Sequence, residues 1–275
     1  MNFRCAPKKG GRPEPLQIMK NLTDPGRIFF GVSIAVLGAQ TVLNHAFPYM
    51  LIPPKLSWRP DSPVVAYFFG TLLALSGVCI LFKIRTRMIS LWLGGLLMLV
   101  FVFYYIPFQF IVADYTQLVQ WENAEKELDL ACGAFIVAGC FVQTDRTSVT
   151  KFLSKLIPIA PILFAITILS YGIIHFQHAD AVADYVPSWV PARLFWAYFA
   201  GAALIASGVA IIIKVKMELA GMLLGVMILT WFVVLHMPRV IVAEDAYLPS
   251  EISSAMLALG YSGIAFMISR GSRGS

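Results

Sequence analysis

Charged side chains are scarce in this chain of 275 residues. Asp, Glu, Lys and Arg make up 13% of it, hydrophobic residues make up 59%, and the mean hydropathy is +0.76. About a quarter of the residues of an average soluble domain are charged. The composition therefore excludes an ordinary soluble domain and predicts an all-α integral membrane protein.

Paired cysteines and phosphate-binding loops are also missing. The four cysteines form no Cys-x-x-Cys motif, and only Cys132 is expected near the outer side of the membrane, so an internal disulfide or a thiol relay is not predicted. There is no glycine-rich phosphate loop and no soluble catalytic domain. Any enzyme activity would need a partner or a membrane-soluble substrate, so the sequence leaves open whether the protein is an enzyme.

Stretches without charge follow one another along most of the chain. Most contain the roughly 18 to 20 residues that a helix needs to cross about 30 Å of hydrocarbon. No charged residue is expected in the middle of any span, which argues against an ion-coupled carrier. We predict eight transmembrane helices, over residues 28–54, 62–82, 88–113, 130–144, 156–179, 194–213, 219–238 and 252–269.

The chain resembles itself at an offset of 131 residues. Residues 57–83 align without a gap to residues 188–214, and 13 of these 27 pairs are identical. Pro107/Pro238 and Asp114/Asp245 continue the match. A repeat of four spans returns the chain to its starting side, so we predict two four-helix bundles of the same orientation, related by internal duplication.

Basic residues set the orientation and the boundaries of the parts. With the N-terminus inside, the segments on the cytoplasmic side carry 16 of the 21 Lys and Arg residues. Both termini are therefore expected in the cytoplasm, and the pI of about 9.2 reflects topology and not nucleic-acid binding. The predicted parts are a basic tail (1–27), the first repeat (28–144), a cytoplasmic linker (145–156), the second repeat (157–269) and a disordered C-terminus (270–275).

Short motifs in the second repeat resemble the DoxX-like (DoxX/DoxD) membrane protein superfamily. They are Gly-Ile-Ile-His-Phe at 172–176, Ser-Trp-Val-Pro at 188–191, Tyr-Phe-Ala-Gly at 198–201 and Ser-Gly at 207–208, and Ser-Trp-Arg-Pro at 57–60 is their counterpart in the first repeat. The resemblance implies a bacterial inner-membrane protein. Some relatives are subunits of quinone-linked oxidoreductases, others accompany thiol or oxidative-stress systems, and some act in protein assembly.

Four histidines are expected in one layer at the outer ends of the spans: His45, His175, His178 and His236. Tyr171, His175 and His178 follow the i, i+4, i+7 spacing of one helix face. We predict a ligand-binding or cofactor-binding site formed by Tyr171, His175, His178 and His236, with His45 in the same layer. A histidine at a membrane interface is, however, commonly just a hydrated polar group.

Three acids at the start of the fourth span follow the i, i+3, i+7 spacing: Glu122, Glu125 and Asp129. Because the charge-free part of that span has only 15 residues, the helix is expected to extend back through these carboxylates. If the two bundles meet there, His175, His178 and His236 with these acids could bind a transition metal or deprotonate a quinol. The alternative is that the acids only stabilise the helix N-terminus through its dipole.

Three hypotheses follow from these patterns. The first is a membrane subunit or accessory factor of an envelope redox system, linked to a quinone or a metal, with an outward-facing His and carboxylate site. The second is a cofactor-free scaffold or assembly factor, and the third is a carrier or receptor for a small lipophilic molecule in an apolar cavity. The expected partners are the lipid bilayer and other membrane or periplasmic subunits, but no nucleic acid, and a homo-oligomer is left open.

Overall fold

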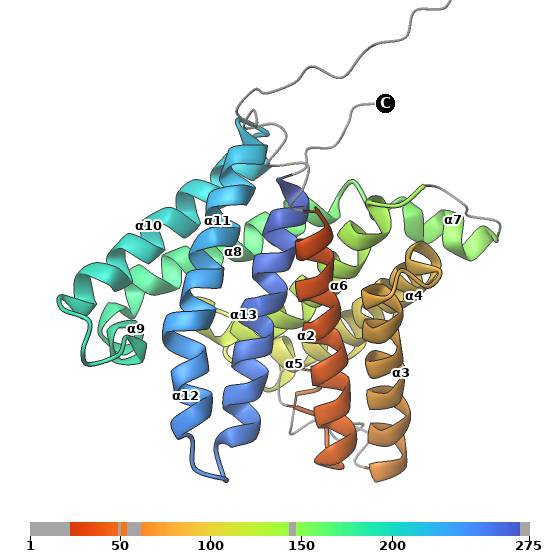
Figure 1. Ribbon diagram of the computed structural model, residues 1–275, viewed down its shortest axis with the longest axis horizontal. Helices are drawn as coiled ribbons and strands as arrows, with labels where there is room; N and C mark the ends of the chain where they lie inside the picture. The colour runs from red at the N-terminus through yellow and green to blue at the C-terminus, as the bar shows by residue number, and fades with distance from the viewer. Residues whose placement is uncertain (1–22, 49–50, 54–61, 143–146, 270–275) are drawn as a thin grey trace, which may run out of the picture.

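The computed structural model describes residues 23–48, 51–53, 62–142 and 147–269. Throughout these ranges the regular structure is helical, and no strand occurs in them (Figure 1). The predicted tail before residue 23, the motif at 57–60, the residues from 270 onwards and the part of the linker at 145–146 lie outside the described ranges. The chain is a multi-pass helical membrane protein.

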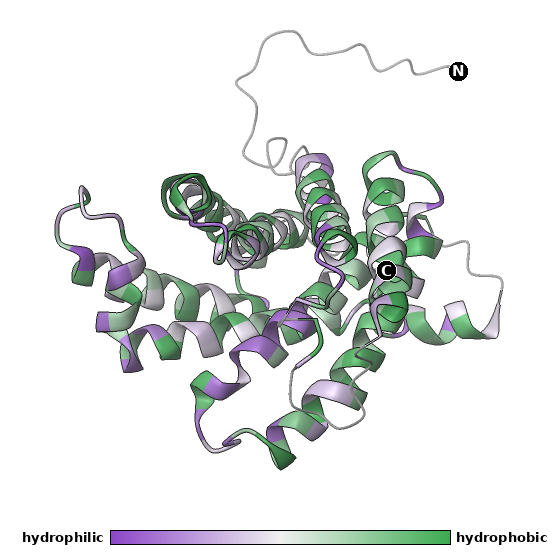
Figure 2. Cartoon of the chain, turned by 90° about the horizontal axis from the view of Figure 1, so that it is seen from below, coloured by the Kyte–Doolittle hydropathy of each residue, from purple (hydrophilic) through white to green (hydrophobic). Residues whose placement is uncertain are grey.

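Seven helical segments in the described residues are long and apolar enough to cross a membrane. Together they cover seven of the eight predicted spans. Most of the length of these helices is hydrophobic, and hydrophilic residues lie mainly in loops and near helix ends (Figure 2). The spans are Asp24–Leu43, Pro63–Leu81, Thr86–Ile111, Ala160–Gln177, Arg193–Ile212, Met217–Val242 and Leu248–Ile268.

The eighth predicted span corresponds to helix α6, Glu122–Gly139. It begins eight residues before the charge-free stretch, so the prediction that the helix extends back through the carboxylates is confirmed. The sequence did not predict that Glu127 and Asp129 are fully buried in this helix. Helix α6 does not count among the seven apolar segments because it contains five charged residues, Glu122, Glu125, Lys126, Glu127 and Asp129.

The main helices occur in pairs at the 131-residue offset. Helix α4 (Thr86–Val100), the π-helical segment η1 (Phe101–Tyr105) and helix α5 (Ile106–Ile111) match α11 (Met217–Trp231), η3 (Phe232–His236) and α12 (Met237–Val242) residue for residue. Proline has no N–H and cannot continue an α-helical ladder. Pro107 and Pro238 follow each π-helical segment, which is where we expect the ladder to widen.

Packing follows the same pairing. Helix α2 (Thr23–Leu43) packs against α3 (Pro63–Leu81), and α8 (Ala160–Gln177) packs against α10 (Arg193–Ile212). Further contacts join the halves: α6 packs against α8 and also against α13 (Leu248–Ile268), and α13 packs against α2. Each half therefore places its last long helix against the first long helix of the other half.

Short helices connect the long ones. Segment η2 (Leu118–Trp121) leads into α6, α7 (Ser148–Ser154) precedes α8, and α9 (Ala179–Tyr185) joins α8 to α10. In the loop before η2, the Asp114 carboxylate accepts hydrogen bonds from the hydroxyl and backbone N–H of Thr116, which lower the pKa of this exposed acid. Asp114 thus closes a turn, as its loop position suggests.

Arg87 ties three helices together at one end of the bundle. Its guanidinium donates to the carbonyl oxygens of Ala138 (2.9 Å) and Phe141 (3.2 Å) and to Ser154 Oγ (3.2 Å), and the residue is only 8% exposed. Two of these bonds go to carbonyls at and just beyond the C-terminal end of α6, where the Ala138 carbonyl also accepts from the backbone N–H of Phe141. Arg87 therefore has a structural role.

Replacing Arg87 by methionine should lower the free energy of unfolding by about 2 kcal/mol, because it removes the hydrogen bonds that join α4 to the end of α6 and to α7. Thermal unfolding of the purified protein in nanodiscs measures the loss. Arg85→Met is the matched control, since Arg85 is exposed at the N-cap of α4. Equal melting temperatures for both variants would contradict a structural role of Arg87.

Candidate functional site

A cavity of about 770 Å³ is lined mainly by the second half of the chain, by α8, α9, α10, α11, η3, α12 and α13. The loop after α9 completes its wall together with Glu122 and Lys126 of α6, which belongs to the first half. This volume is typical of small-molecule sites, which are mostly apolar with a few converging polar groups. Six aromatic residues line it: Tyr171, Tyr185, Trp189, Trp196, Trp231 and Tyr261.

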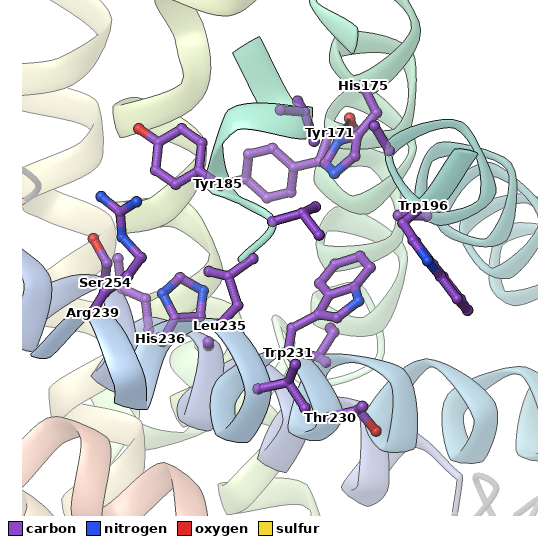
Figure 3. A pocket seen from close by; sticks show the side chains of 18 of the residues that line it. Tyr171, His175, Tyr185, Trp196, Thr230, Trp231, Leu235, His236, Arg239 and Ser254 are labelled. Atoms are coloured by element: carbon purple, nitrogen blue, oxygen red, sulfur yellow. Dashed lines mark hydrogen bonds between the residues drawn. The ribbon is translucent and has the colours of Figure 1, made fainter. Parts of the chain in front are cut away.

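His175 lies on the α8 side of the cavity and faces Trp231 across it (Figure 3). The two rings stack, with centroids 6.1 Å apart and planes at 18°. His175 Nδ1 lies 2.7 Å from the backbone oxygen of Tyr171, so this nitrogen carries a hydrogen and donates it. In the neutral ring Nε2 is then an acceptor, which suits a ligand hydroxyl.

His236 lies on the opposite wall, in the π-helical segment η3. Its Nδ1 is buried and has no hydrogen-bond partner among the described residues. The side chain of Tyr261 also lines the cavity, and its hydroxyl interacts with Asp129 and Tyr171 behind the wall. Buried polar atoms are nearly always hydrogen-bonded in folded proteins. The unsatisfied His236 Nδ1 therefore indicates a bound polar group.

The charged side chains that line the cavity pair with one another. Arg239 donates to both carboxylate oxygens of Glu251, at 2.9 and 2.6 Å, and its guanidinium lies 4.6 Å from the ring centroid of Tyr185. Lys126 Nζ lies 2.6 Å from Glu122 Oε1. Each positive charge is thus matched by a negative one. The cavity wall is close to neutral overall, which favours an uncharged ligand.

Asp129 lies behind the cavity wall, at the contact of α6 with α8. It is fully buried, and Thr167 Oγ1 lies 2.5 Å from its Oδ1. The Tyr171 side chain lines the cavity, and its hydroxyl lies 3.4 Å from Asp129 Oδ2 and 3.4 Å from the backbone oxygen of Glu122. Tyr171 therefore connects the cavity to a buried acid that does not itself line it.

The predicted site residues divide into two groups. Tyr171, His175, His236 and Glu122 line the same cavity, whereas the other four do not. Helix α8 ends at Gln177, so His178 leaves the helical register and is exposed, off the predicted stripe. Glu125, Asp129 and His45 complete the group outside the lining; His45 belongs to the first half, where its Nδ1 lies 2.6 Å from the Tyr67 hydroxyl.

The metal-binding prediction receives no support from this geometry. Within the ranges that the structure describes, no three His, Cys, Asp or Glu side chains come together in a way that could hold a metal ion. The six residues predicted as ligands are dispersed because His178 is beyond the helix end, while Glu125 and Asp129 lie outside the cavity that Glu122, His175 and His236 line.

At three positions equivalent to the cavity wall the first half has the larger side chain, although Trp196 and Trp231 correspond to the smaller Val65 and Val100. Phe69 stands where the second half has Ala200, and Phe108 stands where it has Arg239. Both are buried, and Phe47 packs edge-on against Phe69 with ring centroids 5.6 Å apart. Tyr105, fully buried, takes the place of His236. Small residues in the second half, above all Ala200, leave the space open.

Sequence reasoning missed Trp231, Arg239 and Glu251 as lining residues. Arg239 had a detectable signal, because it is one of few basic residues expected on the outer side and follows Pro238. The exchange of Phe69 for Ala200 within the self-alignment was a second signal, since a lost aromatic ring at a buried position leaves a volume to fill.

Comparison with protein-family models, with curated proteins and with solved structures finds no match.

Proposed function

We propose that this protein binds a small, uncharged, lipophilic molecule with a polar head, of the quinone class, in the cavity of its second half. The single observation that carries the proposal is the cavity itself: about 770 Å³, rich in aromatic rings, with His236 Nδ1 left without a partner among the described residues. Apolar walls with a few unsatisfied polar atoms suit a ligand that is mostly hydrocarbon or aromatic ring.

The histidines favour a quinone or quinol over a simple hydrocarbon. His175 Nε2 can accept a hydrogen bond from a quinol hydroxyl, and the unpartnered Nδ1 of His236 can form a hydrogen bond with a quinone or quinol oxygen. The stacked pair of His175 and Trp231 offers a flat face to a ring. The resemblance to DoxX-like proteins, some of which belong to quinone-linked oxidoreductases, agrees with this ligand class and suggests a redox partner in the bacterial inner membrane.

We further infer an eight-span topology with two parallel four-helix halves. Helix α6 has 18 residues and so extends about 27 Å, enough to cross the hydrocarbon core. The matching π-helical segments and the reciprocal packing of α6 on α8 and α13 on α2 support an internal duplication. With both termini in the cytoplasm, the cavity opens towards the outer side.

Menadione, a naphthoquinone, tests the proposal because quinones quench tryptophan fluorescence. In nanodiscs the wild-type protein should show saturable quenching, and His175→Ala or His236→Ala should weaken the apparent affinity about tenfold, the value of one hydrogen bond to a buried group. Trp231→Phe should reduce the amplitude of quenching. His178→Ala is the matched control and should bind like wild type, because His178 does not line the cavity.

Two results would count against the proposal. Quenching that rises linearly with menadione in every variant would reflect partition into lipid alone. No saturable quenching in a correctly folded protein would instead favour the cofactor-free scaffold, the second hypothesis from the sequence.

A further inference from the structure

The carboxyl of Asp129 and the carbonyl oxygen of Phe164 both lie within hydrogen-bond distance of one threonine hydroxyl. Thr167 Oγ1 lies 2.5 Å from Asp129 Oδ1 and 2.6 Å from the carbonyl oxygen of Phe164. A threonine hydroxyl has one hydrogen and can donate to only one of these oxygens. If Thr167 donates to Phe164, the short contact with Asp129 needs a second hydrogen, and the carboxyl of Asp129 is its only source.

Other groups around Asp129 supply no positive charge. The titratable side chains that act on it are Glu125 and Cys132 from α6, Tyr171 from α8 and Tyr261 from α13. None of these is a cation, and the residue is 0% exposed. A carboxylate buried without a cation is costly, so a neutral carboxyl fits this place better.

A purely structural role for Asp129 is not required by the packing of the two halves. The equivalent position on α13 is Gly260, which packs against the Ser33 side chain of α2 in the reciprocal contact. The contact of α13 with α2 is thus made without a carboxyl at this position. The acid is thus present at this position of α6 and absent from the equivalent position of α13.

Tyr171 provides the route from Asp129 to the cavity. Its hydroxyl lies 3.4 Å from Asp129 Oδ2, and its side chain lines the cavity beside His175. Its ring stacks on that of Tyr261, with centroids 6.4 Å apart and planes at 23°. We propose that Asp129 stores a proton and exchanges it through the Tyr171 hydroxyl with a hydroxyl-bearing ligand in the cavity.

The exchange conserves charge and atoms. A half-turn of the Asp129 carboxyl about its Cβ–Cγ bond presents the proton on Oδ1 to the Tyr171 oxygen. As Tyr171 takes this proton, its own O–H bond breaks and the hydrogen moves to the ligand oxygen. A ligand anion becomes a neutral hydroxyl and Asp129 becomes a carboxylate; the reverse sequence returns the proton.

This inference rests on the proposed function for the identity of the acceptor, but the relay is testable without a ligand. Infrared spectra of the protein in nanodiscs record the C=O band of a protonated carboxyl, which shifts when its hydrogen is replaced by deuterium. Asp129→Asn should remove one such band, whereas Asp180→Asn, at an exposed aspartate of α9, should not. Tyr171→Phe should keep the band and slow its deuterium exchange at least tenfold.

The outcomes separate the relay from ligand binding. If Asp129→Asn removes no protonated-carboxyl band, or if Tyr171→Phe exchanges as fast as wild type, the relay is overturned even if menadione binds. Addition of menadiol, the reduced form of the same probe, should shift the Asp129 band in the wild-type protein and leave it unshifted in Tyr171→Phe. An unshifted band in a wild-type protein that binds menadiol would also overturn the relay.

Discussion

Replacing Ala200 by phenylalanine is expected to weaken menadione binding about a hundredfold, or by about 2.7 kcal/mol. Ala200 lines the cavity and is 5% exposed, so a phenyl group on its Cβ has nowhere to extend except among the neighbouring side chains and the space of the ligand. The substitution copies Phe69, the residue at the equivalent position of the first half. It should therefore be compatible with the helix packing of this fold.

Titration of tryptophan quenching by menadione measures this loss of affinity. Ala202→Phe is the matched control, because Ala202 lies on the exposed face of the same helix α10. It should leave binding unchanged. If Ala200→Phe binds menadione as tightly as wild type while both variants keep the wild-type melting temperature, the ligand does not occupy this cavity.

Replacing Gly77 by leucine should have the largest effect on stability, a loss of about 3 kcal/mol or more in the free energy of unfolding. At Gly77 the backbones of α3 and α2 approach so closely that a Cβ atom would lie 2.6 Å from the carbonyl oxygen of Gly31 and would also collide with the backbone nitrogen of Ala35. Backbone atoms cannot move aside as a side chain can. In a membrane, where lipid is as apolar as leucine, such close contacts are a main source of helix association.

Thermal unfolding and the fraction of monodisperse protein after extraction measure the effect of Gly77→Leu. Thr71→Leu, on the exposed face of α3, introduces the same side chain without a neighbour and should leave the melting temperature unchanged. A Gly77→Leu protein that melts like wild type would mean that α2 and α3 do not depend on this contact.

Composition and periodicity were enough to predict a multi-pass helical membrane protein, because hydrocarbon permits few other structures. The same reasoning placed a helix through Glu122, Glu125 and Asp129, since 15 apolar residues are too few for a span. It did not predict that Glu127 and Asp129 of that helix are fully buried. Prediction of transmembrane helices from hydropathy treats a carboxyl in the membrane as unfavourable. It cannot take into account a hydroxyl donor from another helix, such as Thr167.

The candidate site could be predicted only in part. Helical spacing brought Tyr171 and His175 to one face, but the same rule assumed that α8 continues to His178, whereas it ends one residue earlier. The partners on the opposite wall, Trp231 and His236, are more than 50 residues away along the chain, and their approach depends on how α11 packs. A single sequence contains periodicity within a helix but little information about which faces of distant helices meet.

The π-helical segment Phe232–His236 determines the direction in which Arg239 points. A wide turn contains one residue more than the α-helical turn it replaces, and each residue of a helix turns the chain by about 100°. Removal of that extra residue would rotate Met237–Val242 around its axis and carry Arg239 away from Glu251. The direction in which Arg239 points is thus fixed by the number of residues before Pro238, so a deletion here would alter the cavity wall without changing any residue that lines it.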